Sequence, residues 1–224
     1  MPTEQSKRRV LVLYLILFFA AWTACDLLLA PRLAGLSRTA LILVRDVGLK
    51  ALIWLFPALL LIRRYDGWLA VPRRDLFRAP RSWRLCWEIL LFFALCLILG
   101  SLIRNRGLSL SPSFIPADLI WILFVGLMEE TVFRGWLLNL LLEPGDFDRD
   151  KLPWKPVAIT SVLFLLIHFP LWCRTGALAA NLAGGAFLSI LVLSLVFSLT
   201  FLRSRSLIIP IVLHSAWDLL VTVL

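Results

Sequence analysis

Two adjacent carboxylates and an arginine interrupt an apolar segment that is long enough to cross a bilayer. The segment runs from Ala117 to Leu142, and Glu129, Glu130 and Arg134 lie inside it. A membrane-spanning helix needs about 20 apolar residues. Each charged side chain near the membrane centre costs about 2.5–3.5 kcal/mol on insertion scales, so such groups pair internally or perform a function. We therefore treat these three residues as a candidate site.

Helix geometry assigns different surroundings to the two carboxylates. Glu130 and Arg134 are four residues apart, so they share one helix face in the favourable acid-before-base order. Glu129 lies about 100° away around the helix axis, since an α-helix has 3.6 residues per turn. We therefore predict that Arg134 neutralises Glu130 while Glu129 points elsewhere, and this division of roles is a first indication of catalysis.

The two histidines of the chain both lie in predicted membrane spans. His168 and Glu129 are each about twelve residues from the start of their spans, or about 18 Å, so their depths overlap near the middle of the membrane. His214 lies in the last span, and Asp218 is one turn further along the same face. Carboxylates and imidazoles at a similar depth predict a site for general acid–base chemistry, metal binding or proton relay.

Composition places these residues in a membrane protein. The chain is 61% hydrophobic and 17% charged, and its mean hydropathy is +0.91. Soluble domains have about 25% charged residues. We predict an all-α polytopic transmembrane helix bundle with about seven membrane spans. The predicted spans are Val10–Ala30, Thr39–Ile62, Arg84–Ile103, Ala117–Leu142, Val157–Cys173, Ala179–Leu202 and the segment that follows Arg205 and reaches Leu224.

The net charge of +9 does not indicate nucleic-acid binding, because the basic residues lie between apolar spans. With seven spans and a cytoplasmic N-terminus, the inner loops carry 15 of the 23 Lys and Arg residues. This bias agrees with the positive-inside rule. The loop from Arg63 to Arg84 holds seven of them, and we expect it to lie against anionic lipid head groups.

Some features leave alternatives open. Arg45, Asp46 and Lys50 in the second span could start at the interface, contact neighbouring helices or, for Arg45 or Lys50, touch a substrate. The pair Gly184–Gly185 predicts a close approach of another helix. The four cysteines lack metal-ligand spacing, and we expect all four to be small buried apolar side chains. They are Cys25, Cys86, Cys96 and Cys173.

Three motifs resemble the signature of a known family. Glu129-Glu130-x-x-x-Arg134, Phe164-x-x-x-His168 and His214-x-x-x-Asp218 are similar in order and spacing to the motifs of the CPBP (Abi) intramembrane proteases. That family includes the type II CAAX prenyl endopeptidases. The resemblance divides the chain into an N-terminal three-helix membrane region, residues 1–116, and a catalytic core of four helices, residues 117–224. One position departs from the pattern, since Asp218 stands where the family commonly has Asn.

The resemblance implies a glutamate-dependent peptidase buried in the membrane. Glu129 and His168 would activate a water molecule for attack on a peptide carbonyl. His214 and Asp218 would stabilise the oxyanion. Asp218 could donate a hydrogen bond in its protonated form, or it could stay ionised and accept one from His214. We favour the ionised form.

Glu130 and Arg134 would support these catalytic residues. The resemblance also implies a membrane-anchored protein or peptide as substrate, cut near its C-terminus, with the lipid bilayer as the surrounding partner. Because the chain is short and lacks long termini, we expect a multi-pass protein of the bacterial inner membrane.

Other functions remain possible on the same residues. Glu129, His168 and His214 could bind zinc as two histidines and a carboxylate. The chain has no His-Glu-x-x-His motif, so we favour a reaction without a cofactor. The buried groups could instead form a proton or ion relay in a small transporter, although we find no paired repeats. A catalytically idle scaffold or immunity protein is the third alternative.

Overall fold

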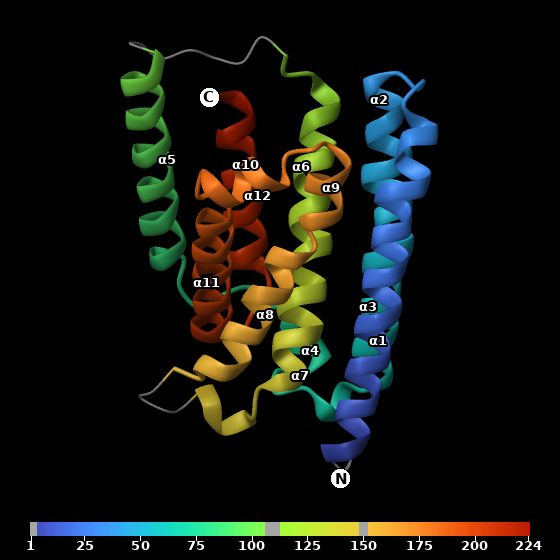
Figure 1. Cartoon of the computed structure of the whole chain (residues 1–224). Helices are drawn as coiled ribbons and strands as arrows, with labels where there is room; N and C mark the ends of the chain where they lie inside the picture. The colour runs from blue at the N-terminus through green and yellow to red at the C-terminus, as the bar shows by residue number, and fades with distance from the viewer. Residues whose placement is uncertain (1–3, 106–112, 148–151) are drawn as a thin grey trace.

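The described part of the chain is a bundle of helices. The computed structural model describes residues 4–105, 113–147 and 152–224, and every regular element within these ranges is a helix (Figure 1). The long helices run roughly side by side, and the two ends of the chain lie at opposite ends of the bundle (Figure 1). The predicted all-α class is confirmed.

The N-terminal half consists of three long helical stretches. The first is α1 (Glu4–Ala24), which continues through a π-helical turn, Cys25–Leu29, and a tighter turn, Ala30–Leu33. The second combines α2 (Arg38–Leu41), two π-helical stretches, Ile42–Leu49 and Ala51–Leu55, and α3 (Phe56–Arg64). A short helix, α4 (Arg73–Leu76), precedes the third, α5 (Arg84–Asn105).

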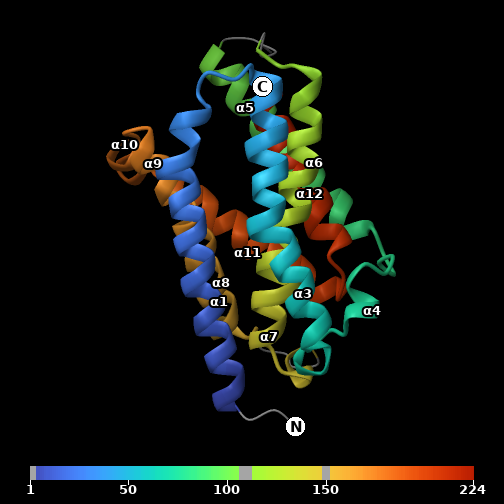
Figure 2. The same ribbon diagram turned by 90° about the vertical axis from the view of Figure 1, so that its right-hand side faces the viewer.

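The C-terminal half is built around α6. This helix covers Pro116–Glu130, becomes π-helical over Thr131–Leu138 and ends as α7 (Asn139–Leu141). It is followed by α8 (Trp154–Leu166), α9 (Phe169–Arg174), α10 (Leu178–Ala183), α11 (Ala186–Ser204) and α12 (Ile208–Val223). In both ribbon views α6 runs through the bundle beside α12 (Figure 2). The two helices carrying most of the predicted site are therefore neighbours.

Four described helical stretches are long and apolar enough to cross a membrane, namely Glu4–Leu33, Arg84–Ile103, Trp154–Arg174 and Ala186–Ser204. The stretches 38–64 and 116–141 are helical throughout but carry charged residues, and Ile208–Val223 is apolar but shorter. Large apolar side chains such as Leu17, Trp87 and Ile103 are exposed on the outside of the bundle. Such a surface suits lipid, and the protein is an integral membrane protein. The number of crossings stays a prediction.

Close packing brings α12 against α6. A Cβ atom at Gly126 would clash with the hydroxyl of Ser215 and come within 3.2 Å of the Ile211 carbonyl oxygen. The Ser215 hydroxyl also donates a hydrogen bond to the Ile122 carbonyl, at 3.3 Å. Glycine at this position therefore lets the two backbones approach closely. One residue before Ser215, His214 faces the end of α6.

Two expectations from the sequence are wrong. The pair Gly184–Gly185 ends α10 and begins α11, with Gly185 at a φ of 79°, so it forms a turn rather than a helix contact. Glycine adopts this left-handed conformation without steric cost. Cys25 and Cys86 are buried as expected, but Cys96 and Cys173 are exposed. A small apolar side chain is also tolerated on a surface that faces lipid, so burial does not follow from hydrophobicity alone.

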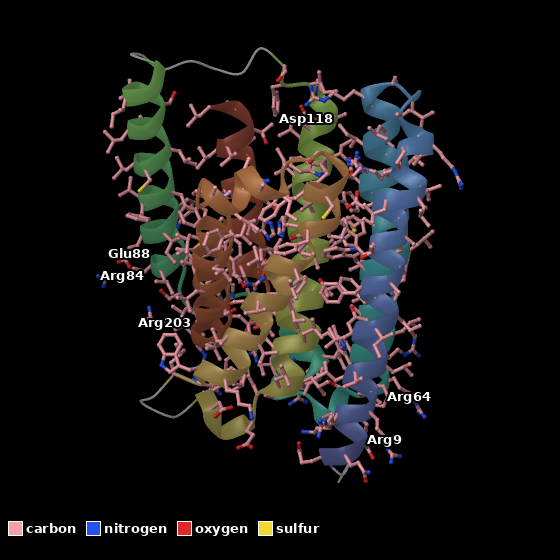
Figure 3. All side chains as sticks on the ribbon, viewed as in Figure 1. Arg9, Arg64, Arg84, Glu88, Asp118 and Arg203 are labelled. Carbon is pink, nitrogen blue, oxygen red and sulfur yellow. The ribbon has the colours of Figure 1, made fainter. Side chains whose placement is uncertain are left out.

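The basic residues are biased toward one end of the bundle. In Figure 3, Arg9, Arg64 and Arg203 lie toward the end that holds the N-terminus, whereas Asp118 lies toward the other end. The basic loop is fixed to the bundle, because the Asn139 side chain bonds the backbone N–H and carbonyl of Val71 at 2.7 and 2.8 Å. This asymmetry agrees with the predicted orientation, which stays a prediction.

Candidate active site

The ion pair predicted from the spacing of Glu130 and Arg134 forms in the centre of the bundle. The Arg134 Nη1 atom lies 3.1 Å from Glu130 Oε1, and both side chains are fully buried. Arg134 Nη2 also donates to the carbonyl oxygen and hydroxyl of Ser194 on α11, each at 2.7 Å. The guanidinium lies 4.8 Å from the Phe164 ring centroid. Several acceptors thus hold one buried cation, which offsets its loss of solvation.

Glu130 also contacts His214. The His214 Nδ1 atom lies 2.8 Å from Glu130 Oε1, so the ring donates Nδ1–H to the carboxylate. The opposite ring nitrogen, Nε2, lies 3.6 Å from Asp218 Oδ2 and 3.8 Å from Glu129 Oε2. Phe197 stacks on the imidazole at a centroid distance of 5.0 Å. His214 is therefore held in one orientation, with Nε2 facing two further carboxylates.

The expected hydrogen bond between His214 and Asp218 is not formed. Their 3.6 Å separation is longer than a hydrogen bond, and Glu130 takes the Nδ1–H instead. The helical spacing correctly places Asp218 beside the ring. It does not reveal that a carboxylate from α6 reaches the other nitrogen.

Glu129 points away from Glu130 and contacts a helix of the N-terminal half. Its Oε1 atom lies 2.6 Å from Lys50 Nζ, and both residues are only 6% exposed. The ammonium group also lies 4.4 Å from the Trp54 ring centroid and 5.7 Å from that of Trp22. The predicted separation of the two glutamates is thus observed, and Glu129 has its own cation.

His168 lies at a break between two helices. Its span is not one continuous helix, because α8 ends at Leu166 and α9 begins at Phe169. Pro170 has no backbone N–H and therefore favours such a break. The His168 Nδ1 atom lies 2.9 Å from the Phe164 carbonyl oxygen, so Nδ1 donates and Nε2 carries the lone pair in the neutral ring.

One aromatic ring connects the two histidines. The Phe164 centroid is 5.6 Å from that of His168 and 5.9 Å from that of His214. Among the described residues, no direct hydrogen bond or ion pair joins His168 to Glu129. If His168 and Glu129 act on one substrate, the attacking water and the peptide bond must lie between these two side chains.

Sequence reasoning missed two parts of this arrangement. Ser194 gave no signal, because a serine in an apolar helix commonly bonds its own backbone. Trp22 lies within the predicted first span, and its indole N–H donates to the Ile167 carbonyl, at 2.9 Å, directly before His168. The sequence marks Lys50 as a charge in a membrane span but does not identify Glu129 as its partner.

The comparison with known families agrees with this geometry. Residues 111–220 match the family model described as Type II CAAX prenyl endopeptidase Rce1-like. The chain belongs to this family through its C-terminal half. Neither a curated protein nor a solved structure matches the chain.

Membership identifies the chain as an intramembrane protease that acts on a membrane-associated protein. The matched segment contains all three motifs and excludes Lys50, Trp22 and Trp54. The Rce1-like segment therefore supplies the acidic and imidazole groups, whereas the contacts of Glu129 with a cation come from outside it. The domain boundary at residues 116 and 117 stays a prediction.

The zinc alternative depends on how the acidic and imidazole side chains are arranged. Within the described ranges, no group of three or more His, Cys, Asp or Glu side chains is arranged to hold a metal ion. Glu129 Oε1 already contacts an ammonium group, whose positive charge would repel a metal cation bound beside it. The Nδ1 atom of each histidine is bonded to another acceptor, which leaves Nε2 as the only nitrogen that could bind a metal. We therefore derive no reaction step through a metal.

Proposed function

We propose that this Rce1-like protease is a metal-free intramembrane glutamic endopeptidase in which Glu129 and His168 activate the attacking water. The observation that carries the proposal is the environment of Glu129. One carboxylate oxygen is held by Lys50, whereas the other faces His214 Nε2 at 3.8 Å. A carboxylate fixed in this way can accept a proton from a molecule bound beside its second oxygen.

In the proposed reaction, the water oxygen attacks the carbonyl carbon of the peptide bond, and a water proton passes to Glu129. The electron pair of the carbonyl double bond moves to oxygen and forms an oxyanion. The proton then reaches the leaving nitrogen as the carbon–nitrogen bond breaks. His168 assists through Nε2, which can accept or return a proton because Nδ1 is bonded to the Phe164 carbonyl.

His214 would stabilise the oxyanion when its ring carries both protons. The Nδ1–H is bonded to Glu130, so the Nε2–H is then directed toward the developing charge. Preorganised donors gain strength where water is excluded, and removing one such donor typically lowers kcat by about 10²–10³-fold. Glu130 and Arg134 act by holding this ring.

We further propose a membrane-anchored protein or peptide as the substrate, cut near its C-terminus, and a cytoplasmic N-terminus for the protease in a bacterial inner membrane. The family description supports a lipid-modified tail as the substrate class. The bias of Lys and Arg toward the end that holds the N-terminus supports the orientation.

The test replaces Glu129 by Gln, which keeps the size and removes the base. We expect Glu129→Gln to lower kcat by about 10²–10⁴-fold, the usual contribution of general acid–base catalysis. Glu88→Gln is the matched control, since Glu88 is an exposed glutamate on α5. In cells that produce each protein, mass spectrometry of membrane-protein C-termini detects cleavage. A farnesylated CAAX peptide in liposomes serves as the substrate for measuring kcat and KM. Wild-type turnover by Glu129→Gln would end the proposal.

The same assay distinguishes the zinc-dependent alternative. We expect full activity of the purified protein in an excess of a strong chelator, together with less than stoichiometric zinc by elemental analysis. Loss of activity on chelation that added zinc restores would instead support Glu129, His168 and His214 as ligands.

A further inference from the structure

The N-terminal half contributes a cation to the reaction centre that the family match does not cover. Lys50 lies between two π-helical stretches, Ile42–Leu49 and Ala51–Leu55. Its ammonium group reaches across 79 positions of sequence to Glu129, at 2.6 Å, and both side chains are only 8% exposed. A π-helical stretch is uncommon and often marks a functional position.

The surroundings of Lys50 fix the position of the ammonium group. Trp54 lies one turn along the same stretch, with its ring centroid 4.4 Å from Nζ. Trp22, on α1, has its centroid 5.7 Å from Nζ and also bonds the backbone directly before His168. Two aromatic faces and one carboxylate thus attract the same cation. The Trp22 contact connects the position of Lys50 with the helix break that carries His168.

The charges of the centre balance only when Lys50 is counted. Three carboxylates lie close to His214, namely those of Glu129, Glu130 and Asp218. Arg134 bonds Glu130, and Lys50 bonds Glu129. With these two cations, a protonated His214 makes the centre neutral. Without Lys50, the buried Glu129 carboxylate would lose its nearest cation, and its charged form would be costly.

We propose that Lys50 is a positioning residue of the hydrolytic reaction. Its ammonium group keeps the Glu129 carboxylate ionised and occupies Oε1, so that Oε2 is the oxygen that receives the water proton. This inference rests on the proposed role of Glu129 as the base. It adds that the N-terminal half sets the charge state and orientation of that base.

The first experiment removes the charge but keeps the side-chain length. We expect Lys50→Met to lower kcat about 100-fold or more, while KM changes less than about threefold, because the substrate does not contact the lost group. Lys50→Arg should regain part of this loss, since it keeps a cation at the same place. Lys155→Met is the matched control, since Lys155 is an exposed lysine at the start of α8. It should keep wild-type kinetics.

A rescue experiment separates the charge from a purely structural role. Lys50→Ala leaves room for a small cation beside Glu129, so we expect added ethylammonium to raise kcat at least about tenfold. Ethanol, a neutral molecule of similar size, should have no effect. If both additives fail although Lys50→Ala remains folded, or if both restore activity equally, the proposed charge role is wrong.

The two proposals fail in different ways. Full activity of Glu129→Gln overturns the glutamic mechanism and the Lys50 inference together. If Glu129→Gln is inactive but Lys50→Met keeps wild-type kcat, only the Lys50 inference is refuted. If Lys50→Met does not fold, the kinetics of Lys50→Arg and the amine rescue of Lys50→Ala decide the question.

Discussion

The same helix, α6, begins and ends with an arginine–carboxylate pair, and the two pairs differ in their surroundings. At its first turn, Arg38 Nη2 donates to both carboxylate oxygens of Asp118, at 2.8 Å to Oδ1 and 2.9 Å to Oδ2. The Arg38 side chain is 48% exposed. At its last turn, Glu130 bonds Arg134, and both side chains are fully buried. The same kind of ion pair, an arginine with a carboxylate, therefore occurs once at the rim and once in the centre of the bundle.

The outer pair has a local structural role. Asp118 Oδ2 also accepts a hydrogen bond from the backbone N–H of Ile115, at 2.8 Å, so it caps the start of α6. A carboxylate in the first turn is also favoured by the helix dipole. Arg38 additionally bonds the carbonyl of Ser113. These contacts serve the helix end, and the Arg38 side chain is half-exposed although Asp118 is buried.

The inner pair is part of a network that reaches the reacting groups. Glu130 accepts hydrogen bonds from both Arg134 and His214 through the same oxygen, Oε1. Because the desolvation of two buried charges is costly, such a pair stabilises the fold less than its Coulomb attraction suggests. The difference from the outer pair indicates that the inner charges serve the orientation of His214 rather than stability alone.

The largest expected effect follows from removing the inner cation. Arg134→Met leaves Glu130 buried without its cation, so we expect the free energy of unfolding to fall by about 3–5 kcal/mol. Activity should be lost, because Glu130 can no longer hold His214 in place. Tryptophan fluorescence of the detergent-solubilised protein during denaturation measures the stability.

Two variants define the limits of that prediction. Arg134→Lys keeps the charge but loses the forked contacts with Ser194, so it should be intermediate in stability and activity. Ser194→Ala removes only the hydroxyl acceptor and should cost about 1 kcal/mol. Stable and active Arg134→Met protein would contradict the assignment of a functional network to the inner pair.

The next effect concerns Asp218, which faces the same imidazole without bonding it. Asp218→Asn removes a negative charge 3.6 Å from His214 Nε2 and leaves the shape almost unchanged. If the ionised carboxylate stabilises the protonated ring, turnover should fall about tenfold, equivalent to about 1.4 kcal/mol in the barrier. The kcat and KM of the two proteins measure this. An Asn variant with equal or higher kcat would instead show that Asp218 acts as a neutral hydrogen-bond donor.

Contacts within one helix were predictable from the sequence, and contacts between distant helices were not. The spacing of Glu130 and Arg134, and of His214 and Asp218, fixes a shared face through helical periodicity. The contact of Lys50 with Glu129 depends on how the second long helix packs against α6. A single sequence contains no periodic signal for that packing, so it indicates the unusual charge of Lys50 but not the partner of that charge.

The backbone breaks show the same limit. The sequence predicts one span over Val157–Cys173, whereas the helix is interrupted between Leu166 and Phe169, at His168 itself. The pair Gly184–Gly185 is interpreted from the sequence as a tight helix contact, but it forms a turn, which equally needs a missing side chain. Only the surroundings of the glycines distinguish the two. The packing contact was made by Gly126 instead.

The smallest expected effect is at the rim, where the Arg38–Asp118 pair, with its half-exposed arginine, provides the control for the inner network. Arg38→Met leaves the buried Asp118 carboxylate its bond to the Ile115 N–H, and the Arg38 side chain it removes is already 48% exposed, so the free energy of unfolding should fall by only about 1 kcal/mol. Activity should be unchanged, because twelve residues of helix, about 18 Å, separate Asp118 from Glu130. Arg84→Met, which removes the exposed pair with Glu88 on α5, should alter neither quantity detectably. The comparison between rim and centre fails if Arg38→Met destabilises the protein as much as Arg134→Met, or if it lowers kcat while the protein remains folded.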